Sequence, residues 1–200
     1  MHFSWMRTTS GVRTPSSCGR APREGPPMPE GKAVATGTHG AFERDRAFRI
    51  RTFRTEDGPF IEAILRASPE AAQWSREALS DFLTSNAGAG AHILVAESSG
   101  KVTGFLMALQ VAEEAEILNV AVIPEQRRSG QATALLGETI KELNPGGVKT
   151  LFLEVRESNH AAIAFYRANG FATGGRRPAY YREPEEAAIC MMRKVAGVPG

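Results

Sequence analysis

The stretch that most constrains this chain joins an apolar strand to an amphipathic helix through a short loop with two arginines and a glycine. Residues 116–122 (EILNVAV) have strand character, and residues 124–131 after them read PEQRRSGQ. Apolar side chains then share one helical face until the Asn-Pro-Gly-Gly sequence at 144–147 ends the helix. Such a loop gathers free backbone N–H groups at the positive end of a helix dipole, where phosphate or diphosphate binds.

The residues of this loop suit an anion. Gly130 lets the backbone approach a ligand closely, Ala132 is too small to block it, and Arg127 and Arg128 add positive charge. Taken alone, the Arg-x-x-Gly-x-Ala pattern is as compatible with an ordinary loop that begins a helix as with an anion-binding loop. It has neither the Gly-Lys-Ser/Thr of a P-loop nor the Gly-x-Gly-x-x-Gly of a Rossmann fingerprint, so it belongs to neither of those classes.

The sequence around this unit continues to switch between strand and helix patterns without an internal repeat. With 200 residues, the chain is long enough for one medium-sized domain with a sizeable core and a tail. The patterns predict a strand over 48–53, a helix from Thr55 to Leu65, a helix from Ser75, two strands (92–97 and 102–110) around a turn at 98–101, strands over 115–123 and 149–155, a helix opening at Ser158 and Asn159 with Gly170 at its C′ position, and two final strands from Phe171 and over 187–192.

Composition excludes several classes of protein. The two cysteines, Cys18 and Cys190, cannot form a disulfide framework, so a small stapled secreted scaffold is excluded. No apolar run approaches the roughly 20 residues of a membrane helix, so we expect a soluble protein without a membrane partner. Residues 1–50 carry eight basic and four acidic residues, which leaves sixteen basic and eighteen acidic residues in 51–200. The basic excess therefore lies in the tail, and no direct nucleic-acid partner is expected.

The first 46 residues are rich in Gly, Pro, Ser, Thr and Arg and have no sustained apolar period. Because they cannot bury enough surface to offset their ordering entropy, we expect a disordered tail. An alternative is an extension that is not translated, with the true start at Met28 or nearby. The ordered domain is expected over 47–194, followed by a flexible C-terminus over 195–200.

The loop has a wider context that carries a family resemblance. Residues 151–166 read LFLEVRESNHAAIAFY, followed by Asn-Gly-Phe at 169–171 and a Tyr-Tyr pair at 180–181, while Asn-Val-Ala-Val at 119–122 precedes the loop. This combination resembles the GNAT superfamily of acetyl-CoA-dependent N-acetyltransferases, and within it the RimI-type ribosomal-protein alanine N-acetyltransferases. The resemblance covers about residues 47–194. It implies an α/β GNAT fold: a mixed, mostly antiparallel, seven-stranded sheet that is splayed in the middle and flanked by about four helices.

The resemblance implies where acetyl-CoA binds. The pantetheine arm is expected to pair with the strand that holds Val120, Ala121 and Val122, where a bulge splays the neighbouring strands apart. Asn159 matches a cofactor-contacting residue and is also a good N-cap for its own helix. No metal is implied. The diphosphate is expected on the loop and first helical turn, which consist of Arg127, Arg128, Ser129, Gly130, Gln131, Ala132 and Thr133.

The resemblance also implies a general base at Glu154 and a general acid at Tyr166. Acetyl transfer needs a neutral amine, whereas an α-amino group with a pKa of about 7.7–8.0 is mostly protonated at pH 7. A carboxylate can remove that proton directly or through water, and a tyrosine can protonate the departing thiolate. A backbone N–H of the splayed strand would hold the developing oxyanion. Cys190 lacks an evident histidine partner, which favours direct transfer in a ternary complex.

Structural alternatives stay open for these residues. Glu154 can instead pair with an arginine such as Arg156 or Arg128 and only position the loop. Tyr166 can bury its ring in an amphipathic helix with its hydroxyl satisfied. His92 is expected as a strand residue and His160 as a helix-start residue. Arg176 and Arg177 are expected on a solvated face, with contact to the substrate as the alternative.

The acceptor side is implied more loosely. In the family, two segments line the acceptor groove: the one after the first helix and the hairpin before the last strand. Trp74, Tyr180 and Tyr181 lie in these segments. The alternative for Trp74 is a structural role in the core. Aromatic walls and an acidic rim suit a short N-terminal peptide. The expected rim, which would attract a basic peptide, consists of Glu113, Glu114 and Glu116.

The resemblance implies acetyl transfer from acetyl-CoA to a protein N-terminal α-amine, specifically the alanine of a small-subunit ribosomal protein in the bacterial cytoplasm. Two other functions remain open. A small amine, such as a polyamine, an amino acid or an antibiotic, can be the acceptor on the same fold. The domain can also be a non-catalytic acyl-CoA-binding module, although the retained Glu154, Asn159 and Tyr166 argue against it. The oligomeric state is not indicated.

Overall fold

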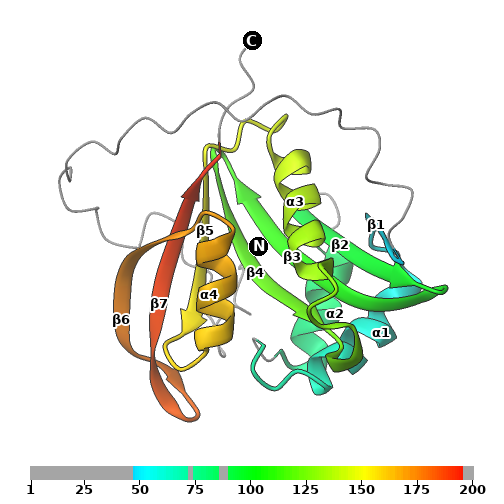
Figure 1. Cartoon of the computed structure of the whole chain (residues 1–200), viewed down its shortest axis with the longest axis horizontal. Coiled ribbons are helices and arrows are strands. Elements are labelled where there is room, and N and C mark those ends of the chain that lie inside the picture. Colours follow the sequence, from blue (N-terminus) through cyan, green and yellow to red (C-terminus); the bar gives the residue numbers. More distant parts are fainter. Residues whose placement is uncertain (1–46, 72–73, 86–89, 196–200) are drawn as a thin grey trace.

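The computed structural model describes residues 47–71, 74–85 and 90–195, so the predictions for the tail and for the last five residues lie outside it. These residues form one seven-stranded sheet with four α-helices (Figure 1). The elements are β1 (Arg49–Thr52), the 3-10 turn η2 (Thr55–Asp57), α1 (Gly58–Arg66), α2 (Arg76–Ser85), β2 (Ala91–Ser98), β3 (Lys101–Val111), β4 (Glu114–Val122), the 3-10 turn η3 (Pro124–Gln126), α3 (Gln131–Leu143), β5 (Thr150–Arg156), α4 (His160–Ala168), β6 (Ala172–Arg182) and β7 (Glu185–Lys194).

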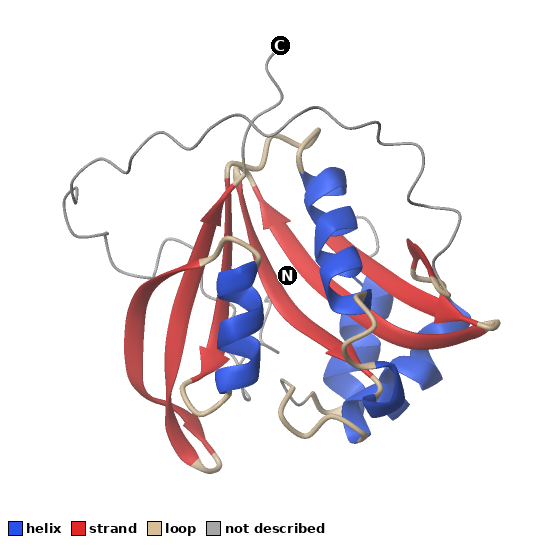
Figure 2. Cartoon of the chain, viewed as in Figure 1, coloured by secondary structure: helices blue, strands red, loops and turns tan. Residues whose placement is uncertain are grey.

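The strands lie in the order β1-β2-β3-β4-β5-β7-β6. Every neighbouring pair is antiparallel except β4 and β5, which are parallel. Figure 2 shows the sheet as two wings that meet at one end of β4 and β5 and spread apart toward the other. The mixed, mostly antiparallel and splayed sheet that the sequence predicted is confirmed.

Helices cover both faces of the sheet. The larger apolar cluster packs α3 and α4 against one face, with Leu135, Leu136 and Ile163 among its members. The second cluster packs α1 and α2 against the other face, with Ile61 and Phe82 among its members. Among the described residues, none of the helices combines the length and the apolar character that crossing a membrane requires.

The first helix differs in detail from its prediction. Thr55–Asp57 form a 3-10 turn, and the α-helix begins only at Gly58 with Pro59 in its first turn. Proline has no N–H and a fixed φ, which suits the start of a helix and not its interior. The predicted end of α4 is confirmed: Gly170 has φ 82°, and the Phe171 N–H donates to the Tyr166 carbonyl over 3.0 Å.

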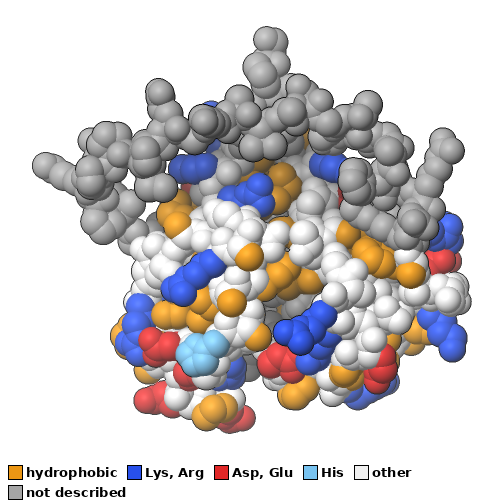
Figure 3. Space-filling view, in the orientation of Figure 1, with side chains coloured by type: hydrophobic (Ala, Val, Ile, Leu, Met, Phe, Trp, Pro, Cys, Tyr) orange, Lys and Arg blue, Asp and Glu red, His pale blue; other side chains and the backbone are white. Residues whose placement is uncertain are grey.

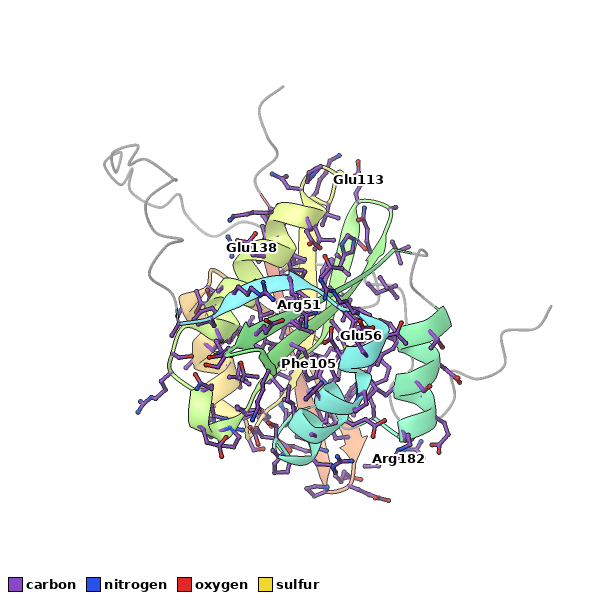
Figure 4. The ribbon with its side chains drawn as sticks, turned by 90° about the vertical axis from the view of Figure 1, so that its right-hand side faces the viewer. Arg51, Glu56, Phe105, Glu113, Glu138 and Arg182 are labelled. Atoms are coloured by element: carbon purple, nitrogen blue, oxygen red, sulfur yellow. The ribbon has the colours of Figure 1, made fainter. Side chains whose placement is uncertain are left out.

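A buried ion pair joins the first strand to this turn. Arg51 donates to both carboxylate oxygens of Asp57, over 2.7 and 2.9 Å, and to Glu97 over 2.7 Å. The Asp57 carboxylate also accepts the Arg54 N–H over 2.8 Å, and the residue is 3% exposed. The Arg51 hydrogen bonds lower the pKa of Asp57 despite its burial. Figure 4 shows Arg51 in the middle of the molecule and Glu138 at its margin.

We expect Asp57→Asn to destabilise the fold by about 3 kcal/mol at pH 7, because it leaves the Arg51 charge without its buried partner. Since the pKa of Asp57 is lower in the folded state, its stabilisation is complete above its unfolded pKa of about 4 and is lost as the pH falls through the folded value. Urea unfolding should therefore show the variant and the wild type converging at low pH.

Glu138→Gln is the matched control. Its carboxylate pairs with Lys141 over 2.7 Å on the exposed face of α3, and its loss should change the free energy of unfolding by less than about 0.5 kcal/mol. An Asp57→Asn penalty that stays the same at pH 3 and pH 7 would contradict the role of the ion pair.

Candidate active site

The sheet opens between β4 and β5 because β4 holds one extra residue. Met107 of β3 pairs with Asn119 and Ala108 pairs with Ile117, which leaves Leu118 as a bulge. A bulge bends its strand and increases the local twist. The parallel pairing with β5 ends at Ile117, opposite Leu153. Beyond this point β4 follows β3 away from β5 (Figure 1).

The open edge of β4 carries the three residues that were predicted to pair with pantetheine. Val120, Ala121 and Val122 pair with β3 on one side, and among the described strands none pairs with their other side. An open strand edge offers backbone N–H and C=O groups to an extended ligand that contains amides. The bulge just before these residues lies where the family resemblance implied it.

At the end of the opening, the loop turns into α3 through two left-handed residues. Arg128 has φ 62° and Gly130, the N-cap of α3, has φ 86°. A Cβ on Gly130 would meet nothing within 4 Å, so glycine is required here by the positive φ and not by a close contact. The N–H groups of the first helical turn have no acceptor within the helix. Among the described residues, no acceptor binds the backbone N–H groups of Gln131, Ala132 and Thr133, so these groups could hold a diphosphate.

Side chains within the loop fix this backbone. Gln131 is 1% exposed; its amide oxygen accepts the Thr103 hydroxyl over 2.9 Å, and its amide nitrogen donates to Gln126 over 3.3 Å. The Ser129 hydroxyl donates to the Gln126 carbonyl over 2.6 Å. The Gln131 side chain therefore faces the sheet, and only its backbone N–H is available to a ligand.

Two predicted cofactor residues converge on the segment after α1. Arg127 pairs with the Glu70 carboxylate over 2.6 Å and donates to the Ser68 hydroxyl over 3.2 Å. The Asn159 amide donates to the Glu70 carbonyl over 3.3 Å, and its oxygen caps α4 by accepting the Ala162 N–H over 3.0 Å. Glu70 thus joins the loop after β4 to the loop after β5. The face in Figure 3 is hollowed between α3 and α4, with apolar side chains in the hollow and charged ones together at its lower edge.

The predicted base, Glu154, lies in a cluster of polar side chains. Its carboxylate pairs with Arg177 over 3.1 Å and accepts a hydrogen bond from the Tyr180 hydroxyl. The Cys190 thiol of β7 lies 3.9 Å from the same carboxylate. Burial and the Glu154 carboxylate raise the pKa of Tyr180, so its hydroxyl remains a donor at neutral pH.

Glu154 pairs with an arginine, as the structural alternative expected, but neither of the two arginines named for it is the partner. Arg156 pairs with Glu186 over 3.1 Å and lies 4.1 Å from the Tyr181 ring centre, and Arg128 is not the partner either. Arg177 was placed with Arg176 on a solvated face, but its side chain is only 23% exposed. The reason is the strand register: Arg177 pairs with Ala188 of β7, two residues from Cys190, which pairs with Glu154 of β5, so its side chain reaches Glu154 across β7. Arg176 instead pairs with Glu157 at the surface. No local sequence signal distinguishes the two neighbouring arginines.

A second carboxyl, Glu116, belongs to this cluster. Burial and repulsion by the Glu154 carboxylate, opposed by Arg177, raise the pKa of Glu116 to about 7. The sequence placed Glu116 on an acidic rim together with Glu113 and Glu114. In the structure Glu113 instead pairs with Lys149 over 2.5 Å at the far end of the sheet. Figure 4 shows Glu113 and Arg182 at opposite ends of the molecule, so Glu113 does not meet the tyrosine hairpin, whereas Glu116 does.

The predicted acid, Tyr166, lies on the buried face of α4 and belongs to the larger apolar cluster. Its ring contacts Phe165 and Phe171 edge-on, with centroid distances of 5.1 and 5.5 Å. Burial, and then Tyr181, raise the pKa of Tyr166, so the phenol stays protonated. Burial, and then the Glu154 carboxylate, raise the pKa of Tyr181 to about 12.

The remaining acceptor-side residues lie apart from this cluster. Trp74 packs edge-on against Phe82 of α2 with a centroid distance of 5.3 Å, at the margin of the second apolar cluster. That position agrees with the core-anchor alternative. Glu114 is the first residue of β4, and no ion pair or hydrogen bond between described side chains joins it to Glu154. Among the described residues, no three His, Cys, Asp or Glu side chains are grouped as metal ligands.

Comparison with known proteins agrees with this geometry. The model of the acetyltransferase (GNAT) family matches residues 58–171, more than half of the chain, and the protein belongs to this family. Its relatives include the Escherichia coli K12 [ribosomal protein bS18]-alanine N-acetyltransferase, 44% identical over 95 residues. That match spans 46% of this chain and 64% of the relative, just under two thirds of its length.

Two longer matches extend the comparison. A Bacillus subtilis protein to which the same activity is provisionally assigned is 32% identical over 142 residues, which span 71% of this chain and 92% of that one. The crystal structure of the ribosomal-protein-S18-alanine N-acetyltransferase from Escherichia coli superposes with a TM-score of 0.64 at 34% identity, over 76% of this chain and 96% of that one.

We expect Gly130→Val to weaken binding of CoA about tenfold or more. Valine at φ 86° costs about 1–2 kcal/mol, and the loop relieves that strain by turning its N–H groups away from their present direction. Isothermal titration calorimetry with CoA measures the effect.

Gly100→Val is the matched control, because Gly100 also has positive φ (75°) and open space around it, but lies in the turn between β2 and β3. It should lower stability by a similar amount and leave CoA affinity unchanged. Equal affinity in Gly130→Val and Gly100→Val would contradict the assignment of the loop.

Proposed function

We propose that this protein transfers the acetyl group of acetyl-CoA to the N-terminal α-amine of a protein, specifically the alanine of a small-subunit ribosomal protein. The observation that carries this proposal is the opening between β4 and β5 beyond Ile117, with the free N–H groups of α3 at its end. The activity assigned to its relatives and the match to the family model support the choice of reaction and acceptor.

In this proposal, the chain holds acetyl-CoA mainly through backbone groups. The open edge of 120–122 pairs with the pantetheine amides, and the N–H groups of 128–133 bind the diphosphate. Arg127 and Asn159, which contact Glu70 in this structure, line the same opening. Acetyl-CoA supplies an activated thioester, and the chain supplies the alignment and the proton transfers.

The reaction needs two proton movements. A carboxylate accepts the proton of the acceptor ammonium, and Glu154, directly or through water, is the group that the family resemblance assigns to this step. The free amine then forms its bond to the acetyl carbon while the carbon–sulfur bond breaks. Tyr166, protonated because burial raises its pKa, gives a proton to the departing sulfur. The products are CoA and the acetylated N-terminus.

The proposal also covers the domain boundaries, the cellular compartment and the partners of the protein. Residues 47–194 are the catalytic domain, residues 1–46 are a tail outside it, and the enzyme works in the bacterial cytoplasm without a metal ion. The acceptor is an N-terminal peptide, and neither nucleic acid nor a membrane is a partner.

Incubation of the full chain with acetyl-CoA and a short basic peptide that begins with alanine should release free CoA, detected with a thiol reagent. The same peptide with a blocked N-terminus is the control and should give no release. Spermidine, amino acids and an aminoglycoside should compete poorly with the peptide. Turnover with a small amine and none with any free N-terminal peptide would overturn the acceptor assignment.

Tyr166→Phe should lower turnover by about 10²-fold, the typical loss for one positioned acid, and leave CoA affinity almost unchanged. The aromatic ring that packs on Phe165 and Phe171 is retained, so the melting temperature should change little. Steady-state kinetics measures turnover, and calorimetry measures CoA affinity, in the variant and in the wild type. A wild-type rate in this variant would remove Tyr166 from the mechanism.

A further inference from the structure

The hairpin of β6 and β7 is bound at its turn by a side chain from the end of β5. Arg156, the last residue of β5, donates to the Glu183 carbonyl and to the Glu186 carboxylate, each over 3.1 Å. Its guanidinium also lies 4.1 Å from the centre of the Tyr181 ring, within the range of a cation–π contact. One side chain therefore contacts both strands of the hairpin and the turn between them.

The strand register brings these groups together. Arg156 is paired with Ala188 of β7, and Glu186, two residues earlier on β7, is paired with Tyr181 of β6. Paired residues, and residues two apart on one strand, share a face of the sheet. Because Ala188 carries only a methyl group, the guanidinium can extend over it to the next pair. Glu154, two residues before Arg156, lies on this same face.

Backbone pairing holds the hairpin weakly near its tyrosines. β6 is an outermost strand of the sheet and pairs only with β7. Its pairing is interrupted between Arg177 and Tyr181, where Ala179 has φ 47°, and such an irregularity disrupts the ladder locally. Only two residue pairs lie between this interruption and the turn. Side-chain contacts from Arg156 are therefore made where the backbone ladder is shortest.

Glu186 connects the hairpin to the start of α4. Its carboxylate accepts the Ser158 N–H over 2.5 Å, and Ser158 directly precedes Asn159, the N-cap of α4. Figure 1 shows the turn of the hairpin and the loop between β5 and α4 at the same end of the sheet. The Ser158 hydrogen bonds, and then Arg156, lower the pKa of Glu186, so Glu186 is ionised at neutral pH.

We propose that Arg156 and Glu186 are positioning residues for the acceptor: they hold Tyr181 and the turn of the hairpin at a fixed place beside the start of α4. The acceptor groove is then formed before the peptide binds, and the peptide does not have to order it. This proposal rests on the proposed function, in which the hairpin lines the groove for an N-terminal peptide. Arg156 and Glu186 act through Tyr181 and the turn, and they do not contact the reacting atoms.

Arg156→Met tests the proposal through steady-state kinetics with the alanine-initiated peptide. Methionine is also unbranched, but it neither donates hydrogen bonds nor carries a charge. KM for the peptide should rise about tenfold, whereas kcat, KM for acetyl-CoA and CoA affinity should change little. Arg156→Lys should raise KM for the peptide by a similar factor, because an ammonium keeps the charge and lacks the planar fork.

A double variant shows whether the two residues act as one unit. Glu186→Gln removes the charge that Arg156 pairs with, but its amide oxygen can still accept the Ser158 N–H. KM for the peptide should therefore rise less than in Arg156→Met. Arg156→Met combined with Glu186→Gln should be no worse than Arg156→Met alone, because the two residues share one contact. Increases in KM that multiply in the double variant would contradict the pairing.

Arg49→Met is the matched control. Arg49 donates twice to Glu97, over 3.0 and 2.6 Å, on β1 at the opposite edge of the sheet, so both KM values should stay at their wild-type level. A wild-type KM for the peptide in Arg156→Met, or an equal rise in both KM values, would overturn the proposal. If Arg156→Met fails to fold, Arg156→Lys provides the same comparison. Absence of turnover in the wild type would instead overturn the proposed function.

Discussion

The separation of β4 from β5 is the constraint on which the rest of this structure depends. Two parallel strands that remained paired to their ends would leave no room for a ligand within the sheet. The extra residue Leu118 ends the pairing after Ile117, because a bulge twists β4 toward β3. The two wings then carry their loops and their helices, α3 and α4, to opposite sides of one opening (Figure 1). An open strand edge and a free helix N-terminus meet there as a consequence.

The charged groups around the opening come from elements far apart in the sequence. Glu70 after α1 bridges Arg127 and Asn159, which follow different strands. Arg177 and Tyr180 reach Glu154 only because β6 pairs back along β7, which itself pairs with β5. One arginine near two carboxyls cannot neutralise both equally. Glu154 holds Arg177, and burial beside that carboxylate leaves Glu116 with the raised pKa.

Local patterns were sufficient to predict most elements of the fold. Alternating and helical periods placed the strands and helices within a few residues, and Gly170 and the Asn-Pro-Gly-Gly sequence placed two helix ends. The pattern did not reveal the 3-10 turn before α1 or the buried ion pair of Arg51 and Asp57, because the latter joins residues through their packing. The predictions of the arginine that pairs with Glu154 and of the position of Glu113 were wrong for the same reason: both depend on how distant residues pack.

The sequence by itself therefore determined the order of the elements, the position of the loop between β4 and α3, and the family, because each of these depends on residues that are close along the chain. Only the tertiary structure decided which carboxyl pairs with Arg177 and which has a raised pKa, and where the acidic residues lie relative to the tyrosines. Those properties depend on strand register and burial, and both arise from contacts between residues that the chain brings together only when the whole sheet has formed.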